Sequence, residues 1–531
     1  MAIASGIAPP PGADRSGAEP PAPGPPVTDP IPPAMTEVTR LLSIGAHLDR
    51  EFADRVIDEL LENRQRKAAP AYGYDAATVL GHALAARRLR GTRRGVIATA
   101  LLLWFAVGLL GSVWGDFGAT VFWTATVIAL WAAWASLLIE KIVVRQIVTV
   151  HLRARPRPGA RYGFDGEPPQ DPEDMEEQYR EIREEQDPAS GVVHYGGYVP
   201  FVGAGDLQRS WSFAVLLDGR AAGPHSALRP TGTAPDGPPP AEEAGARRPD
   251  PRPFTGAELT AYVRDRLTSH LLTDVDMPDQ RLDGLEVTKR LYVRADGPAP
   301  PDTVTLASSE RYDEAREFLV VRVGSWQQEL VLTVFLNVDL KGRVLYTQLH
   351  GYQLLPIRAA YHEADRLSRG VDAKVLGILA VKALTETLLG GLASVFRSPR
   401  PLVTSLKRRQ GWTGGLSAIT GSDEEEQAFG DWGALHSVRD LGASDGYHHY
   451  YQQMDSAKYL KVIERRTLEV IFDFLDSKDV DTAEFRARQA EVLNVGILQT
   501  GGGTIVNSGA TAVGPDASAS ATTARKAANR P

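Results

Sequence analysis

The glycine-rich segment at residues 195–206 is the most unusual local pattern in the sequence. It reads YGGYVPFVGAGD, and a turn of this composition can aim backbone N–H groups at an anion. Gly203 and Gly205 are therefore the candidate anion-binding residues. Neither the phosphate-loop nor the dinucleotide pattern is complete, because no Lys-Ser or Lys-Thr pair follows Gly205 and no helix clearly opens after it. The alternative, which we favour, is a bend between two strands whose glycines permit tight packing.

Histidines supply a second set of candidate ligands. His448 and His449 lie in the stretch YHHYYQQ, downstream of His436, and imidazole is a common metal ligand. No carboxylate stands at a recognised spacing from them, and neighbouring residues of a strand point to opposite faces. We therefore interpret this stretch as an aromatic cluster at a surface or an interface, and we predict no metal site.

Other catalytic patterns are incomplete or missing. His362-Glu363 begins like the zinc-protease motif, but position 366 is Arg, so the second histidine is absent. No Gly-x-Ser-x-Gly elbow occurs in a strand–turn–helix setting, and no phosphoryl-transfer signature is present. The 0 cysteines exclude a disulfide framework, a thiolate zinc site and a cysteine nucleophile. We predict no catalytic residues and no cofactor, and hence a protein that is not an enzyme.

Length and charge narrow the class of protein further. The chain has 531 residues, of which 43% are hydrophobic, enough for a core in each of two or three domains. Its net charge is -8 and its pI is about 5.8. Phosphate binding needs a basic surface, so nucleic acid is not an expected partner.

Two apolar stretches without charged residues occupy residues 95–114 and 118–139. Each has about 20 residues, the length that crosses a hydrocarbon core of about 30 Å at 1.5 Å per residue. The turn between them is so short that the two spans must run antiparallel. We predict one transmembrane hairpin over residues 95–139, with the lipid bilayer as its partner. The alternative is a pair of buried core helices in a soluble protein.

Basic residues flank the hairpin on both sides, whereas the connecting turn has no Lys or Arg. The positive-inside rule then places both chain ends in the cytoplasm and makes this a multi-pass protein of the cell membrane. The flanking cations are Arg87, Arg88, Arg90, Arg93 and Arg94 before the first span, and Lys141, Arg145, Arg153, Arg155 and Arg157 after the second.

Small residues recur four apart in the second span, at Ala125, Ala129 and Ala133. This spacing lets helix backbones approach closely. We favour packing within the hairpin, and the alternative is a homo-oligomer through the same three residues. Ionisable residues are absent from both spans, which argues against a proton or substrate path.

Hydrophobic periodicity predicts the elements outside the hairpin. Apolar residues at helical spacing indicate a helix over residues 36–66, and another over 255–273 with Thr255 as N-cap and Glu258 in a capping box. Strands are predicted at 210–218, 285–294, 318–323, 329–338 and 343–349, with a hairpin turn at 339–343. Residues 371–396 are apolar but contain charges, so we expect a buried or membrane-surface helix there.

The resulting fold class is an α+β membrane protein, in which a two-helix hairpin joins a cytoplasmic α+β domain and C-terminal helices. The predicted parts are a disordered Pro-rich tail (1–35), cytoplasmic helices (36–94), the hairpin (95–139), basic then acidic linker helices (140–190), the α+β domain (191–370) with a disordered loop (221–253), the apolar helix (371–396), a C-terminal helical region (397–498) and a flexible tail (499–531).

The stretch YGGYVPFVGAGD followed by WSFAV, together with this layout, resembles uncharacterised integral membrane proteins of actinobacteria. The resemblance implies no activity and no site residues. We expect a membrane-tethered binding or scaffold protein. The order of helices also looks like small two-transmembrane effectors, which implies as the alternative an effector that oligomerises and permeabilises the membrane on sensing a ligand. A third hypothesis is an enzyme that uses the glycine-rich turn.

Overall fold

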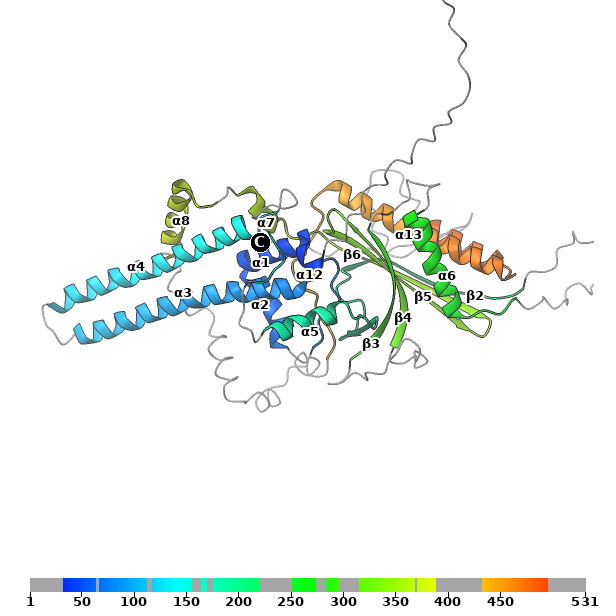
Figure 1. Ribbon diagram of the computed structural model, residues 1–531, viewed down its shortest axis with the longest axis horizontal. Helices are drawn as coiled ribbons and strands as arrows, with labels where there is room; N and C mark the ends of the chain where they lie inside the picture. Colours follow the sequence, from blue (N-terminus) through cyan, green and yellow to red (C-terminus); the bar gives the residue numbers. More distant parts are fainter. Residues whose placement is uncertain are drawn as a thin grey trace, which may run out of the picture. The chain divides into compact units, whose positions relative to one another are not determined.

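Helices and strands combine in a mixed α+β structure, as the sequence predicts (Figure 1). The computed structural model describes residues 32–63, 66–111, 117–154, 164–169, 175–219, 251–273, 282, 284–295, 315–367, 370–387 and 432–494. From Pro33 onward they belong to one compact unit. The predicted tail at 499–531, and nearly all of the predicted tail at 1–35 and loop at 221–253, lie outside the described residues.

Six strands of the described chain form one sheet in the order β1-β3-β4-β5-β6-β2. β1 pairs with β3 in parallel, and all other neighbours are antiparallel. β3 has the predicted bounds, and the other predicted strands differ by a few residues at their ends. The strands are β1 (Val192–Tyr195), β2 (Asp206–Leu216), β3 (Leu285–Arg294), β4 (Ala315–Ser325), β5 (Leu330–Lys341) and β6 (Val344–Leu354).

Three helices cover one face of this sheet. α6 (Gly256–Thr268) and α13 (Tyr450–Ser477) pack on the central strands, and α14 (Ala483–Asn494) packs on β2 (Figure 1). Thr255 caps α6 as predicted, because its hydroxyl accepts a hydrogen bond from the Glu258 N–H at 3.2 Å. The Glu258 carboxylate accepts a hydrogen bond from the Thr255 main chain, as the predicted capping box requires. It also pairs with Lys478 at 2.6 Å, which ties α6 to the end of α13.

An aromatic core fills the opposite face of the sheet. Phe201, from the glycine-rich segment, stacks on Phe335 of β5 with ring centroids 4.0 Å apart. Tyr292 and Phe318 meet the same ring edge-on, and the buried Tyr72 joins the cluster. The glycine-rich segment therefore covers the sheet directly, with Phe201 as its anchor.

A separate helical core joins segments from both sides of the apolar hairpin. The predicted helix at 36–66 is broken in the structure, because Asp49 has an extended backbone (φ -107°, ψ 110°) and its side chain accepts from the Phe52 N–H. The helical elements of this core are α1 (Glu37–Leu48), α2 (Arg50–Ile57), η2 (Asp58–Glu62), the start of α3 (Ala76–Gly111), η3 (Ile147–His151), α5 (Glu176–Gln186), α7 (Ala359–His362), η9 (Glu363–Arg366) and α12 (Val438–Leu441).

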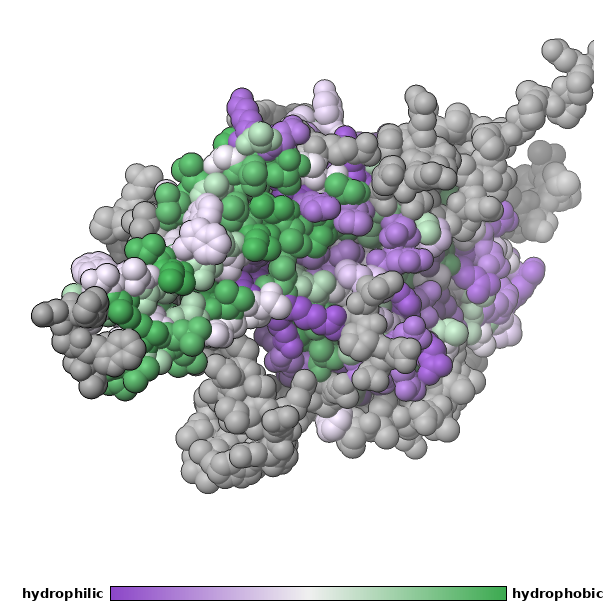
Figure 2. Space-filling model, turned by 60° about the vertical axis from the view of Figure 1, so that its left-hand side comes forward, coloured by the Kyte–Doolittle hydropathy of each residue, from purple (hydrophilic) through white to green (hydrophobic). Residues whose placement is uncertain are grey.

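The predicted hairpin appears as α3 and α4 (Phe117–Gln146), which run side by side (Figure 1). Both helices are long and apolar enough to cross a membrane by length and composition, and only 6% and 11% of their most apolar stretches are buried. Figure 2 shows apolar residues gathered along them. At the base of the pair, Arg93 binds Glu140 at 2.6 Å.

Within the predicted apolar segment at 371–396, residues 373–386 form a helix, α8 (Ala373–Glu386), that packs against α4, and residues 388–396 lie outside the described residues. The Trp134 indole donates a hydrogen bond to the Ala380 carbonyl at 3.0 Å. Lys141 pairs with Glu386 at 2.8 Å, and Arg145 donates to the Gly370 carbonyl at 3.1 Å. Lys141 and Arg145, which the sequence analysis treats only as flanking cations of the hairpin, therefore also hold α8 in place.

Candidate functional site

The turn between β4 and β5 has an unusual backbone. Trp326, Gln327 and Gln328 are all left-handed, with φ of 53°, 58° and 66°. Residues with a side chain rarely adopt this backbone conformation, because it costs roughly 1–2 kcal/mol per residue. The indole of Trp326 donates to Asp455 at 3.1 Å and stacks on His449. These contacts stabilise the strained turn. This turn places the next residue, Glu329, beside a cluster of histidines.

Glu329, His362 and His448 form this cluster, which we call the His–Glu cluster. The Glu329 carboxylate lies 3.0 Å from His362 Nε2. One ligand atom from each of the three residues lies within 4.8 Å of the other two. The two imidazole rings meet edge to face, with centroids 5.7 Å apart. All three side chains are partly buried, so solvent can still reach the cluster.

Each histidine of the cluster is positioned by buried neighbours. His362 ends α7, and the adjacent Tyr361 is buried and donates to Asp49 at 3.2 Å. This contact docks α7 on the helical core. The backbone N–H groups of His448 and His449 both donate to Oε1 of Gln452, at 2.9 and 3.1 Å.

The two histidines differ in their electrostatics. The hydrogen bond that His362 donates to the Glu329 carboxylate raises the pKa of His362, although burial opposes it. Burial and the nearby His362 lower the pKa of His448. His448 is therefore less readily protonated than His362. Its Nε2 is buried and has no hydrogen-bond partner within the part of the chain that the structure describes.

Arg439 supports the cluster from α12. Its side chain is fully buried, and Nη2 donates to the main-chain carbonyl of Glu329 and to that of Leu355. Burial lowers the pKa of Arg439 to about 10, while Glu329 opposes the shift. The guanidinium therefore fixes the backbone that carries the Glu329 carboxylate.

The sequence did not connect these residues. His362 and His448 both stood out in it, but Glu329 lies far from either along the chain and follows a turn without a recognisable turn signature. The neighbouring histidines diverge in the structure: His448 joins the cluster while His449 stacks on Trp326. Two imidazoles and one carboxylate can share a proton or hold a divalent transition-metal ion.

The glycine-rich turn has a packing role in the structure. Gly203 and Gly205 are left-handed, with φ of 82° and 85°, and a Cβ on Gly205 would overlap the main chain at Gln353. The Gly203 N–H donates to the Asp440 carboxylate, an anion within the chain itself. Burial and Asp206 raise the pKa of Asp440 to about 6, while Arg439 and the Gly203 hydrogen bond oppose this. Binding of an external anion at this turn stays a prediction.

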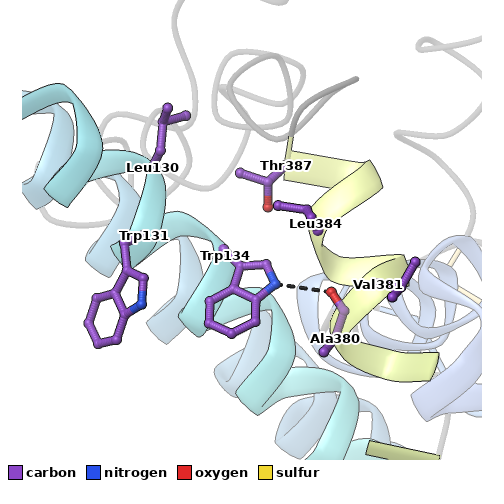
Figure 3. Close-up of a pocket in the computed structure, with 7 residues that line it drawn as sticks. All are labelled: Leu130, Trp131, Trp134, Ala380, Val381, Leu384 and Thr387. Carbon is purple, nitrogen blue, oxygen red and sulfur yellow. Dashed lines mark hydrogen bonds between the residues drawn. The ribbon is translucent and has the colours of Figure 1, made fainter. Parts of the chain in front are cut away.

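A third feature is an apolar groove of about 440 Å³ between α4 and α8. Figure 3 shows Trp131 and Trp134 of α4 on one side, with the indole of Trp134 bonded to the Ala380 carbonyl of α8. The lining residues are Leu130, Trp131, Trp134, Ala380, Val381, Leu384 and Thr387. The Thr387 hydroxyl donates back to the Ala383 carbonyl, so the groove offers almost no free polar group.

Comparison with known proteins gives one result. Residues 210–507 match the family model described as the AbeC-like domain, which is more than half of the 531 residues. The chain belongs to the AbeC-like domain family. No curated protein and no solved structure matches it. The AbeC-like domain contains all members of the His–Glu cluster and excludes α3 and α4. Its description states no activity, and the likeness to actinobacterial membrane proteins stays a prediction.

Proposed function

We propose that this protein is an integral membrane protein in which α3 and α4 anchor the AbeC-like domain to the cytoplasmic face of a membrane, where it acts as a binding or scaffold module. The observation that carries the proposal is the exposed apolar surface of the hairpin. Its large side chains include Leu102, Phe105, Trp123, Ile128 and Trp131, each 65–70% exposed.

Water is a poor environment for such a surface. Burying a large apolar side chain is worth about 1.5–3 kcal/mol relative to leaving it in water, and monomeric soluble proteins rarely expose apolar patches of this extent. Lipid removes the cost without any partner protein. Both helices also satisfy their backbone hydrogen bonds internally, as a spanning segment must.

The orientation rests on the cations at the open end of the hairpin. Some of them pair with acids, as Arg87 does with Glu62 at 2.9 Å and Arg93 with Glu140. Acidic residues contribute little to the positive-inside rule, which counts Lys and Arg. The proposed topology therefore keeps both chain ends in the cytoplasm.

Single cysteines test the topology cleanly, because the chain has 0 cysteines. A membrane-impermeant maleimide should label D116C, between the two spans, on intact cells. It should label E51C, on the exposed side of α2, only after lysis. Full-length protein should also stay in the pellet after alkaline carbonate extraction. Labelling of E51C on intact cells, or release by carbonate, would contradict the proposal.

The two-transmembrane effector is the alternative function. Its homo-oligomer would use Ala125, Ala129 and Ala133, but Ala133 is only 3% exposed within a single chain. That burial favours packing within the chain. Dye-loaded vesicles containing the purified protein should therefore retain their dye, whereas leakage that A129W abolishes would favour the effector.

A further inference from the structure

We propose that the His–Glu cluster binds one divalent transition-metal ion through Glu329, His362 and His448. The cluster is independent of the anchor, so this inference goes beyond the proposed function. Two imidazole nitrogens and one carboxylate oxygen form the donor set, and a water molecule or a second ligand would occupy the remaining position.

The distances fit such an ion after small movements. Metal–ligand bonds of about 2.0–2.1 Å place neighbouring ligand atoms roughly 3–3.5 Å apart. Glu329 Oε2 and His362 Nε2 are already 3.0 Å apart. The ligand atom of His448 completes a set whose members lie within 4.8 Å of one another. A modest rotation of the His448 ring would therefore close the site.

The unpartnered nitrogen of His448 is a second, independent observation. A buried polar atom without a hydrogen bond costs about 1–3 kcal/mol, and Nε2 of His448 is such an atom among the described residues. A metal ion between the rings would give this lone pair a partner. It would also replace the hydrogen bond between Glu329 and His362 with two metal bonds.

Hydrogen bonds from neighbouring residues position two of the three donor residues without a metal ion. Gln452 fixes the main chain at His448, and Arg439 fixes the main chain at Glu329. The two residues come from α13 and α12, so rigid elements determine the spacing of the donors. Sites held in this way lose less entropy on binding a metal.

The donor types select the class of ion. Imidazole suits zinc, iron, cobalt, nickel and copper, whereas magnesium and calcium take oxygen ligands. Sites with three protein ligands keep a position open, and those that hold catalytic zinc are of this kind. With His362 about a third exposed, a water molecule or a small ligand can reach the open position.

Metal titration of the full-length protein tests the proposal. Protein without a polyhistidine tag is stripped with EDTA in detergent micelles and titrated with ZnCl2 by calorimetry, then with CoCl2 by visible absorption. Wild type should bind one zinc ion per chain. With cobalt it should show the d–d bands of Co²⁺ coordinated by nitrogen and oxygen. Excess Mg²⁺ should not displace the bound ion. H362A and H448A should each weaken binding at least about tenfold.

His436 provides a matched control, because it is exposed and lies outside the cluster. H436A should bind zinc as wild type does. Thermal unfolding of each variant without metal checks folding, and H448Q replaces H448A if the latter unfolds. Absence of stoichiometric zinc, unchanged affinity in folded H362A and H448Q, or an equal loss in H436A would each overturn the proposal.

Discussion

Backbone strain is concentrated at single residues in the turn that precedes the His–Glu cluster. Three consecutive residues with side chains adopt the left-handed conformation in the turn before Glu329, although glycine would adopt it freely. Strained residues persist where surrounding contacts fix them, and they cluster at functional sites. Here the fixing contacts belong to Trp326 and hold the turn beside His449. The strained turn and the His–Glu cluster are therefore adjacent in the structure.

Replacing Gln327 with glycine should stabilise the protein. Gln327 is left-handed and exposed, so Q327G removes strain and should gain up to about 1 kcal/mol. W326G relieves the same strain but loses the hydrogen bond to Asp455 and the stacking on His449, and should destabilise. Thermal unfolding of both variants measures the difference. Equal shifts in the two variants would show that the Trp326 contacts contribute nothing.

Gly205 should tolerate no side chain. Its φ of 85° and the overlap of any Cβ with the main chain at Gln353 predict that G205A lowers the free energy of unfolding by about 2 kcal/mol or more. G377A is the matched control, since Gly377 lies within α8 and a Cβ added there would have no neighbour within 4 Å among the described residues. That variant should gain up to about 1 kcal/mol. A harmless G205A in thermal unfolding would refute the packing role.

Among whole elements, the sequence predicts the sheet better than the helices around it. Near-continuous apolar runs define β4 and β5 because both faces of these strands are covered, one by α6 and α13 and the other by Phe201. The break at Asp49 was missed because the apolar periodicity runs through it. An aspartate that caps the next helix looks like any residue of the polar face until Phe52 is seen to donate to it.

The packing of α1 against α3 should make stability depend on pH. His47 and His82 are buried and lie 3.3 Å apart, before the apolar part of α3. Burial, with Arg90 nearby, lowers the pKa of His47 to about 4. Burial, with His47 and His151 nearby, lowers the pKa of His82 to about 3. Both residues fold as neutral imidazoles.

The sign of the effect follows from proton binding. The unfolded chain takes up protons on these histidines near pH 6.5, whereas the folded chain does not until about pH 4 to 3. Their contribution is therefore complete above about pH 6.5 and is lost as the pH falls below it. Thermal unfolding should show a loss of a few kcal/mol near pH 5. The double variant H47L/H82L should flatten this response, while H436A should keep it.

Across the whole molecule, the decisive contacts join segments that are remote in the sequence. Arg40 is almost fully buried and bonds both Asp365 and the Leu152 carbonyl. The helical core gathers residues from before the hairpin, after it and beyond the sheet. Periodicity carries no information about such pairings, so the sequence predicted the hairpin, whose signal is local, and missed the His–Glu cluster, whose members meet only in the folded chain.

The same arrangement predicts that the hairpin is dispensable for folding. Arg93 and Glu140 meet at 2.6 Å where α3 and α4 leave the helical core, and paired helices lie about 8–10 Å apart. A Gly/Ser linker of about six residues spans this gap at 3.3–3.6 Å per residue. A chain with residues 96–138 replaced by this linker should remain in the supernatant without detergent. Its circular dichroism should fall only by the helix removed.

The full-length chain, lysed in the same buffer, is the control and should sediment with the membranes. If the linker variant also sediments with them, a segment other than the hairpin anchors the protein, and α8 with its exposed Val381 and Leu384 is the first to test. If the variant aggregates instead, the helical core needs α3 and α4 to fold. A soluble variant that still binds zinc with the affinity of the full chain would separate the anchor from the His–Glu cluster, because each would then work without the other.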